Sequence, residues 1–479
     1  MKVVFVVPPP LNKEKIPERL FGCSYTVYSM PDLAILYPAS ILKERGVEVE
    51  IFTGTKMKKR DFWEEIPKAD FYIFHTVLLS QKDDIAAGWR LSKKAKVIFF
   101  GPQPTYTPKD FLLNESCLVV RGEADFLLAE IVAAKDPTIL KGVSFLKKGK
   151  AYHNETWGII EDLDKLPFPA RELDPNEYRS LKLKDAKFTV LLGSRQCSYR
   201  CYFCVPNSIS WARELEWKIW AKKPGKPPVK VRSAENIVAE VKDLVKKGYQ
   251  EFSFIDDQFL WAKERSLEIC RGLKGLGIEY GILARADRLV DEEVIKALAE
   301  SGCQYVDIGV ESFNQAVLND IKKDLKVETI YQSVALLKKY GITPKLNIMF
   351  GTSPLETEGM IKDYIQKTLE LPISYCMYSI ATPFPGTEFE KVARKKGWFL
   401  KKLDIYKNLD PAKRSLISYP HLSAKQLERI VLIANRRFYL RPKILLKQVL
   451  KIKSFSGLID TIKGGSRILI GSRNHEEIN

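Results

Sequence analysis

The sequence predicts an α/β protein: a doubly wound domain, then a partial barrel of six strand–helix units, then a basic helical segment. Short apolar runs alternate with helical stretches from the first residues to about residue 397. Such alternation is typical of parallel sheets covered by helices. The chain of 479 residues is too long for one ordinary domain. We therefore expect domains at 1–140 and 187–400, a connector at 141–186 and a helical segment at 401–479.

The first domain begins with a continuous β-branched and aromatic run at 3–7, which is typical of a strand buried on both faces. A helix is expected over 33–45, where the helical spacing ends at Gly46. The other elements share short periodic runs bounded by turn residues: strands at 47–52, 70–76, 97–100 and 117–120, and a helix at 125–134. In such a sheet, ligands bind at the carboxyl edge of the strands.

The connector contains a hairpin at 142–152 and a stiff, extended stretch at 166–169. The second domain then repeats a strand–helix unit six times. Its strands are expected at 188–192, 251–255, 279–284, 305–310, 343–349 and 374–381, with helices at 234–247, 264–275, 291–300, 328–340 and 356–370. Six units are fewer than the eight of a closed barrel, so we expect an open barrel that admits a large substrate.

Three cysteines, Cys197, Cys201 and Cys204, follow the first barrel strand at the spacing C-x3-C-x2-C. Loops at the carboxyl end of a strand are where parallel α/β folds keep their active sites. Thiolates are soft ligands that suit iron–sulfur clusters or zinc. A structural zinc site needs a fourth Cys or His, and the sequence offers none near this loop. Three thiolates on a four-iron cluster would leave one iron open to bind substrate.

With the aromatic Phe203 before the last cysteine, this loop resembles the signature of the radical S-adenosylmethionine superfamily. The resemblance implies a 4Fe-4S cluster on the three cysteines, whose open iron binds the amino and carboxylate groups of S-adenosylmethionine. It implies cleavage of the sulfonium by one electron to a 5′-deoxyadenosyl radical, which abstracts a hydrogen atom. The electron would come from a donor such as ferredoxin or flavodoxin.

The resemblance assigns S-adenosylmethionine contacts to Phe203, Asp257, Arg285, Glu311 and Asn347. By position alone, adjacent Asp residues such as 256–257 are equally well a helix cap and a solvated neighbour. The stretch 309–312 matches the family's G-x-E-S, and 383–387 matches its P-x-P-G-T turn. The loop 350–357 departs from the family's G-L-P-G-E-T, so no role is assigned at 352–355. No catalytic residue is assigned.

The first domain resembles the cobalamin-binding domain of cobalamin-type radical S-adenosylmethionine enzymes in the stretches 31–39, 101–103 and 120–123. The resemblance implies cobalamin contacts at Thr76, Gly101, Gly122 and Glu123. The D-x-H-x-x-G motif that supplies an axial His in other cobalamin proteins is missing, and His75 lacks its context. Cobalamin would therefore bind without a His ligand. The alternative is a Rossmann-like domain that kept the shape and lost the cofactor.

The net charge of +18 suits an anionic membrane face, nucleic acid or a solvated lysine-rich surface. The stretch 211–232 combines three Trp with seven Lys or Arg, and we expect it to cover the active site. From residue 434 onward, ten Lys or Arg and three acidic residues accompany apolar positions in helical register: Ile444, Leu445, Val449, Leu450 and Ile452. This segment predicts either a membrane-surface helix or a helix packed on the barrel.

The segments 419–423 and 437–443 resemble the branch that contains anaerobic magnesium-protoporphyrin ester cyclase and hopanoid-biosynthesis radical enzymes. The resemblance implies methylation or carbon-skeleton rearrangement at an unactivated carbon of a large apolar or lipid-like molecule. One alternative is a radical tRNA-modifying enzyme; nucleic acid is disfavoured because the first 140 residues hold only Cys23 and Cys117, whereas tRNA methylthiotransferases carry three further cysteines there. Another alternative is an iron–sulfur module without turnover.

Scattered cysteines and the lack of a long uncharged apolar run predict a cytoplasmic protein with peripheral contact to the inner membrane face.

Overall fold

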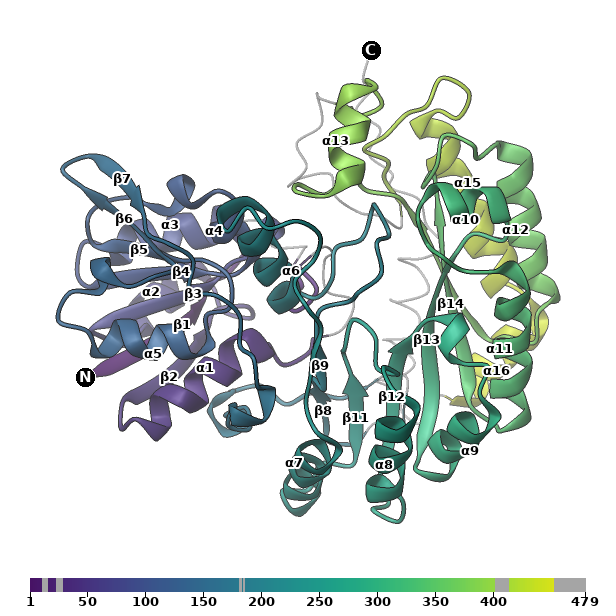
Figure 1. Cartoon of the computed structure of the whole chain (residues 1–479), viewed down its shortest axis with the longest axis horizontal. Helices are drawn as coiled ribbons and strands as arrows, with labels where there is room; N and C mark the ends of the chain where they lie inside the picture. Colours follow the sequence, from purple (N-terminus) through teal and green to yellow (C-terminus); the bar gives the residue numbers. More distant parts are fainter. Residues whose placement is uncertain (11–15, 23–28, 181–182, 184–185, 401–412, 452–479) are drawn as a thin grey trace. The chain divides into compact units, whose positions relative to one another are not determined.

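The computed structural model describes residues 1–10, 16–22, 29–180, 183, 186–400 and 413–451, apart from the side chains of 447–451 (Figure 1). Its described parts pack into two compact units. Unit 1 comprises Met1–Ser198 and Val205–Tyr280, and unit 2 comprises Tyr199–Cys204 and Gly281–Asn479. Both are mixed α/β, as predicted. The boundaries expected at 140, 186 and 400 stay predictions.

Unit 1 contains a seven-stranded sheet with the order β2-β1-β3-β4-β5-β6-β7. Its strands are β1 (Lys2–Val7), β2 (Glu48–Thr53), β3 (Phe71–His75), β4 (Lys96–Phe100), β5 (Cys117–Val120), β6 (Val143–Lys147) and β7 (Lys150–His153). The first five strands are parallel to one another. Strand β6 pairs antiparallel with β5, and β7 pairs antiparallel with β6. The expected hairpin thus forms, and it extends the sheet because β5 would otherwise present an unpaired edge.

Helices cover both faces of this sheet, which makes the domain doubly wound, as predicted. On one face, α1 (Leu33–Glu44) and α5 (Asp125–Ala133) contribute a continuous apolar stripe to the core. On the other face, Phe62 of α2 (Lys59–Glu65) and Leu91 of α3 (Gln81–Leu91) belong to one hydrophobic cluster with Val97 and Phe99 of β4. The sequence pattern missed these helices because α2 holds five charged residues among seven, and the buried positions of α3 include Gln81, Asp84 and Gly88.

The six predicted barrel strands all form, in the order β15-β14-β13-β12-β11-β8. They are β8 (Phe188–Leu191), β11 (Glu251–Phe254), β12 (Glu279–Ala284), β13 (Cys303–Glu311), β14 (Thr343–Phe350) and β15 (Tyr375–Ile380). Among them, β8 pairs in parallel with β11, and β14 pairs in parallel with both β13 and β15. Sheet order follows chain order, which is the result of successive strand–helix units.

The helices between the strands also match their predicted positions: α7 (Ala234–Lys246), α8 (Lys263–Leu273), α9 (Glu292–Glu300), α11 (Val327–Lys339) and α12 (Glu358–Glu370). Smaller elements were not predicted: α4 (Pro102–Tyr106), α6 (Ser208–Leu215), a π-helical turn (Glu216–Trp220), β9 (Ser194–Arg195), β10 (Lys230–Val231), α10 (Gln315–Asp320) and α13 (Glu388–Lys395). Several of them lie at the strand ends that build the site.

Two helices form the last described part of the chain, α15 (Ala424–Tyr439) and α16 (Pro442–Lys451). On α16, Ile444 is buried, whereas Leu445 and Leu446 are exposed. The predicted apolar positions Val449, Leu450 and Ile452 lie outside the described side chains. Within the described ranges, every helix is too short or too polar to cross a bilayer.

Candidate functional site

The cysteine loop follows β8 and β9, as the sequence predicted. Cys197, Cys201 and Cys204 are half-buried thiols, and none of them forms a disulfide. Cys197 belongs to unit 1, and the other two belong to unit 2. Within unit 2, the Cys204 amide donates to the Cys201 carbonyl at 3.2 Å, so these two thiols lie on one tight turn.

The donor set decides which metal group these cysteines could hold. In the described part of the chain, no three His, Cys, Asp or Glu side chains meet closely enough to hold a single metal ion. A four-iron cluster binds each thiolate through a different iron atom, and therefore spaces the thiolates more widely than one ion would. Three thiols without a fourth Cys or His nearby fit such a cluster better than a structural zinc ion.

In unit 2, a turn between α10 and α11 contacts the cysteine loop. The Tyr202 amide donates to the Ile321 carbonyl at 3.3 Å. Two residues further on, Lys323 is buried, and its Nζ lies 2.9 Å from Glu311 Oε1 at the end of β13. Burial works against the ammonium, but the charges of Glu311 and Cys201 outweigh it and raise the pKa of Lys323. This turn therefore brings a cation next to both a cluster cysteine and a predicted S-adenosylmethionine contact.

Arg285, at the end of β12, is the second cation of this edge. Its guanidinium lies 3.5 Å from the centre of the Tyr199 ring, which is part of the cysteine loop. Its Nε donates to Asp287 at 2.9 Å, and its Nη2 donates to the Asp324 carbonyl at 2.8 Å. Arg285 and Glu311 thus lie beside the loop, while their roles toward S-adenosylmethionine stay predictions.

The other predicted S-adenosylmethionine contacts have different surroundings. On β14, Asn347 Oδ1 is a buried acceptor without a hydrogen-bond partner among the described residues. Phe203 is buried edge-on against Tyr202, so it supports the loop from within. In unit 1, Asp257 Oδ1 accepts from the Asn207 amide at 2.8 Å and fixes the start of α6. Burial raises the pKa of Asp257 to about 6, and its Oδ2 has no partner among the described residues.

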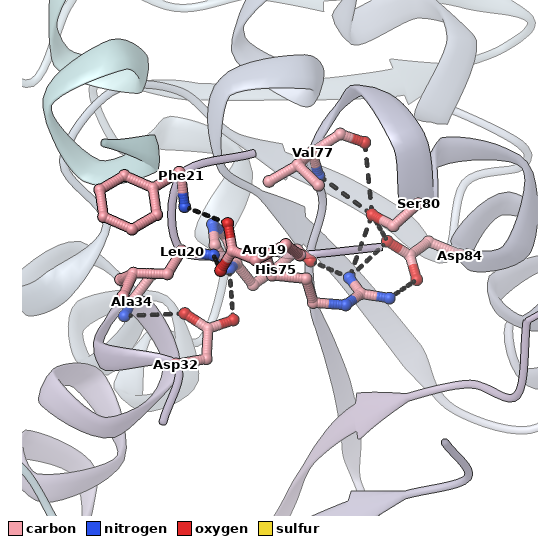
Figure 2. Close-up of polar contacts among 10 residues, drawn as sticks. Arg19, Leu20, Phe21, Asp32, Ala34, His75, Val77, Ser80 and Asp84 are labelled. Carbon is pink, nitrogen blue, oxygen red and sulfur yellow. Dashed lines mark hydrogen bonds and ion pairs between the residues drawn. The ribbon is translucent and has the colours of Figure 1, made fainter. Parts of the chain in front are cut away.

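The seven-stranded sheet has its topological switch point between β1 and β3, because β2 lies on one side of β1 and β3 on the other. Ligands of open α/β sheets bind outside the carboxyl ends of the strands at such a point. There, His75 ends β3 and is buried, and its Nδ1 lies 2.6 Å from Asp32 Oδ2 (Figure 2). Since a carboxylate only accepts, Nδ1 donates this bond, and Nε2 has no hydrogen-bond partner among the described residues.

A second buried network holds this strand end in place. Arg19 donates to both carboxylate oxygens of Asp84 at 2.8 and 2.9 Å and to Ser80 Oγ at 3.1 Å (Figure 2). The same guanidinium donates to the His75 carbonyl. The ring of His75 is therefore fixed by Asp32, and its backbone is fixed by Arg19.

The predicted cobalamin contacts Thr76, Gly101 and Gly122 lie along the same carboxyl edge. Thr76 Oγ1 is buried without a partner among the described residues. At Gly101, with φ +109°, a side chain would begin 2.8 Å from the His75 ring and the Thr76 carbonyl. At Gly122, with φ +73°, it would begin 3.0 Å from Glu216 Cγ. Both glycines are required by backbone conformation and by close approach.

Next to Gly122, the buried residues Arg121 and Glu216 form an ion pair without a hydrogen bond between them. Arg121 Nε lies 3.6 Å from Glu216 Oε2, which is too far for a hydrogen bond. Both oxygens of Glu216, together with Arg121 Nε and Nη1, lack hydrogen-bond partners among the described residues. Burial raises the pKa of Glu216 to about 7, against the lowering effect of Arg121. The part of the chain that the structure describes therefore offers these four polar atoms no hydrogen bond.

Glu123, the fourth predicted cobalamin contact, is fully engaged instead. Its Oε1 accepts from Arg195 Nη1 at 2.8 Å, and its Oε2 accepts from the Ile160 amide at 2.7 Å. Arg195, two residues before Cys197, also bonds both oxygens of Asp125 at 2.8 and 2.9 Å. Burial disfavours the Arg195 cation, but Asp125 and Glu123 outweigh it and raise its pKa. This ion cluster ties the start of the cysteine loop to the end of β5.

A small, partly open cavity of about 20 Å³ lies at this edge. Its lining includes His75, Gly101 and Gly122 on the sheet side and Ser208 and Ala212 of α6 on the other. Unpartnered polar atoms and close glycines fit the amide-rich rim of a corrinoid. The volume, however, holds about one water molecule. The polar groups at this edge therefore fit the cofactor, whereas the space between the sheet and α6 is far too small for it.

Residues 191–368 match the model of the radical SAM superfamily. This part of the chain is the radical S-adenosylmethionine domain of an enzyme. The predicted family is confirmed, and with it the 4Fe-4S cluster and S-adenosylmethionine as cofactors of this radical enzyme.

Relatives with assigned names support the predicted branch. The chain is 28% identical over 472 residues to an uncharacterized methyltransferase of Pyrococcus horikoshii, covering 95% of this chain and 96% of the relative. It is 23% identical to the hopanoid C-3 methylase of Methylococcus capsulatus, covering 81% and 72%. Its identity to the anaerobic magnesium-protoporphyrin IX monomethyl ester cyclase of Rubrivivax gelatinosus is also 23%, covering 58% of this chain and 49% of the cyclase. The chain thus spans about half of that cyclase.

Among solved structures, the radical enzyme resembles the methyltransferase TsrM from Kitasatospora setae, which was solved with cobalamin and a [4Fe-4S] cluster bound. The TM-score is 0.61 at 15% identity, and the match covers 90% of this chain and 81% of TsrM. At that identity the likeness shows a shared fold. It confirms the predicted combination of a cobalamin-binding type domain with a radical S-adenosylmethionine barrel.

The sequence pattern missed several residues that structure brings to the two sheet edges: Arg121, Asp125, Arg195, Glu216 and Lys323. Three of them carried a usable signal, since Arg121 lies in the stretch 120–123, Arg195 stands two residues before the first cysteine and Asp125 two residues after Glu123. Glu216 and Lys323 reach the site from a helical turn and from a turn that are distant in the chain. Only their packing reveals them.

Proposed function

We propose that the protein is a cobalamin-dependent methyltransferase that methylates an unactivated carbon of a large apolar or lipid-like molecule. The observation that carries the proposal is the carboxyl edge of the seven-stranded sheet. His75 Nε2, Thr76 Oγ1 and both carboxylate oxygens of Glu216 are buried there without a hydrogen-bond partner among the described residues. Unsatisfied buried polar groups are costly, so a site that collects several of them is suited to a polar-rimmed ligand.

The names of the relatives support methyl transfer and the substrate class. The relative that matches nearly the whole chain is named a methyltransferase, and another is named a hopanoid C-3 methylase. TsrM, with the same fold, binds both cobalamin and the cluster. A hopanoid is a polycyclic lipid, which agrees with the open barrel expected from six strands.

In this proposal, Cys197, Cys201 and Cys204 hold the cluster. Asp257, Arg285, Glu311 and Asn347 orient S-adenosylmethionine, and Thr76, Gly101 and Gly122 line the corrinoid site. When bound, the cluster and cobalamin supply the radical and the methyl carrier. Glu123 serves the site indirectly, since Arg195 and Ile160 occupy its carboxylate. The first turns of α6, with Ser208 and Ala212, would separate from the sheet to admit the ring.

The test compares the wild-type chain with Cys201→Ala after anaerobic reconstitution. We expect wild type to bind iron, sulfide and cobalamin and to release 5′-deoxyadenosine. Cys201→Ala should lose the iron and the cleavage while it still binds cobalamin, because the corrinoid site lies in unit 1. The matched control is Cys270→Ala, a buried cysteine of α8, which should keep its iron. Full iron content in Cys201→Ala would contradict the assignment.

Carbon-skeleton rearrangement is a second candidate, favoured by the likeness to an ester cyclase. S-adenosylmethionine with a deuterated methyl group separates the two, because only methyl transfer carries the label into the product. A radical tRNA-modifying enzyme would instead label tRNA, and an iron–sulfur module without turnover would release no 5′-deoxyadenosine. Ferredoxin or flavodoxin is proposed as the electron donor, and dithionite can replace it in these assays.

The exposed pair Leu445 and Leu446 on the basic helix α16 supports peripheral contact with an anionic membrane. We expect Leu445→Ser/Leu446→Ser to lower cosedimentation with anionic liposomes several-fold. The control is Ile433→Ser, an exposed apolar residue on α15. Equal cosedimentation of both variants and wild type would rule the contact out.

A further inference from the structure

The turn between α10 and α11 has an unusual backbone. Lys322 and Asp324 have φ values of +55° and +49°, a left-handed conformation that costs a residue with a side chain free energy. Glu311, which faces this turn, has φ +67°. Three such residues at one place persist only when the surrounding contacts fix them, and strain of this kind concentrates at functional sites.

The contacts that fix the turn come from the cysteine loop and from neighbouring strand ends. Tyr202, between two cluster cysteines, donates its amide to the Ile321 carbonyl at 3.3 Å. Arg285 donates to the Asp324 carbonyl at 2.8 Å, and Ser353 Oγ donates to Asp320 Oδ2 at 2.6 Å. The turn is therefore built together with the cysteine loop inside unit 2.

Lys323 is the residue that this geometry directs inward. Its neighbour Lys322 is about half exposed and pairs with the exposed Glu388 at 2.6 Å, whereas Lys323 is 6% exposed and pairs with the buried Glu311 at 2.9 Å. A buried ion pair contributes little net stability, because desolvation offsets the attraction. An apolar residue would serve packing equally well, so the buried charge itself needs a reason.

The Lys323 ammonium lies beside the cysteine loop as well as beside Glu311, and this position explains why a buried charge is kept there. Lys323 stands two residues after Ile321, whose carbonyl accepts the amide of Tyr202, the residue next to Cys201, at 3.3 Å. A lysine ammonium has three N–H donors, and the contact with Glu311 uses one of them. The reduction potential of an iron–sulfur cluster depends on nearby charge, hydrogen bonds to its sulfurs and exposure. A fixed cation beside one cluster thiolate stabilises the form of the cluster that has gained an electron.

We propose that Lys323 is a positioning residue that raises the reduction potential of the cluster, and that Glu311 holds it there and moderates the effect. The step concerned is the uptake of one electron by the oxidised cluster from an external one-electron reductant. The inference rests on the proposed ligation of the cluster by Cys197, Cys201 and Cys204. Lys323 lies outside the cysteine loop, and it would control how readily the cluster is reduced.

The experiment is a redox titration of the anaerobically reconstituted full-length protein without S-adenosylmethionine, with dithionite as reductant and the reduced cluster followed by electron paramagnetic resonance. We expect Lys323→Met to lower the ratio of reduced to oxidised cluster at least tenfold at a given potential, which is about 59 mV for a one-electron couple. Lys323→Arg should stay near wild type because it keeps the charge. Lys322→Met is the matched control and should titrate as wild type, since its side chain points away from Glu311.

Glu311→Gln makes the test specific for charge. Removing the carboxylate should raise the potential, which is opposite to the effect of Lys323→Met, whereas general damage to the turn would move both variants in one direction. If Lys323→Met loses its iron, Glu311→Gln and Lys323→Arg decide the question. Unchanged potentials, or shifts of the same sign, in clusters of full iron content would overturn the inference. Wild type without iron would contradict the proposed function instead.

Discussion

The residues directly after β5 take part in two buried ion groups, and the two groups differ in how many of their polar atoms are hydrogen-bonded. Glu123 forms close bonds with Arg195 and Ile160, and Arg195 bonds both oxygens of Asp125. Arg121, two residues earlier, faces Glu216 at 3.6 Å, with several polar atoms unpartnered among the described residues. In the first group only Arg195 Nε has no partner among the described residues, whereas in the second both oxygens of Glu216 have none. Short hydrogen bonds fix the fold, and buried groups without them are candidates for contact with a ligand. The comparison separates the residues that hold this edge together from those that we propose contact the cofactor.

The largest expected effect comes from breaking the satisfied cluster. Arg195→Met would leave Glu123 and Asp125 buried without their cation, which should cost about 3–5 kcal/mol of unfolding free energy. The measurement is the denaturant midpoint in urea. As a control, Arg60→Met removes an exposed ion pair with Glu64 and should cost less than about 1 kcal/mol. If the unfolding free energy of Arg195→Met falls only slightly, the ion cluster contributes less to the stability of the fold than its short distances indicate.

The unsatisfied pair should produce a pH dependence. Because the folded-state pKa of Glu216 is raised from 4.5 to about 7, its contribution to stability is present below pH 4.5 and is lost as the pH rises through 7. From a pKa shift of this size, we expect the unfolding free energy of wild type to fall by about 3 kcal/mol relative to that of Glu216→Gln as the pH rises from 4.5 through 7. The measurement is the unfolding free energy of both proteins at pH 5 and pH 8. Parallel pH profiles would show that Arg121 already neutralises Glu216.

A smaller effect on stability is expected from replacing glycines at positive φ. Two such glycines separate the cost of a steric clash from the cost of the backbone conformation. Gly101→Ala and Gly46→Ala both place a side chain at positive φ, but only at Gly101 would the new carbon meet other atoms, at 2.8 Å from His75 and the Thr76 carbonyl. Gly46→Ala should cost about 1–2 kcal/mol from conformation alone, and Gly101→Ala should cost more. If cobalamin binds here, Gly101→Ala should weaken it at least tenfold and Gly46→Ala should not. Cobalamin affinity is measured from the visible spectrum after gel filtration. Equal affinities of the two variants for cobalamin would exclude this sheet edge as its binding site.

The sequence by itself determined the order of elements and the cysteine loop. Continuous apolar runs such as residues 3–7 and 188–192 predict strands because both faces of a parallel sheet are buried. The spacing of Cys197, Cys201 and Cys204 predicts the cluster because the ligands lie within eight residues. In both cases the signal is local, so no knowledge of distant contacts is needed.

Only the tertiary structure decided which charged residues meet at the strand ends. Arg195 reaches Glu123 across 72 positions of sequence, and Glu216 approaches Arg121 from a π-helical turn that no periodicity predicts. It also showed that Glu123 is engaged by the protein and that Lys323, one of two adjacent lysines, is the buried one. Burial and charge pairing depend on which segments pack together, and that information is distributed over the whole chain.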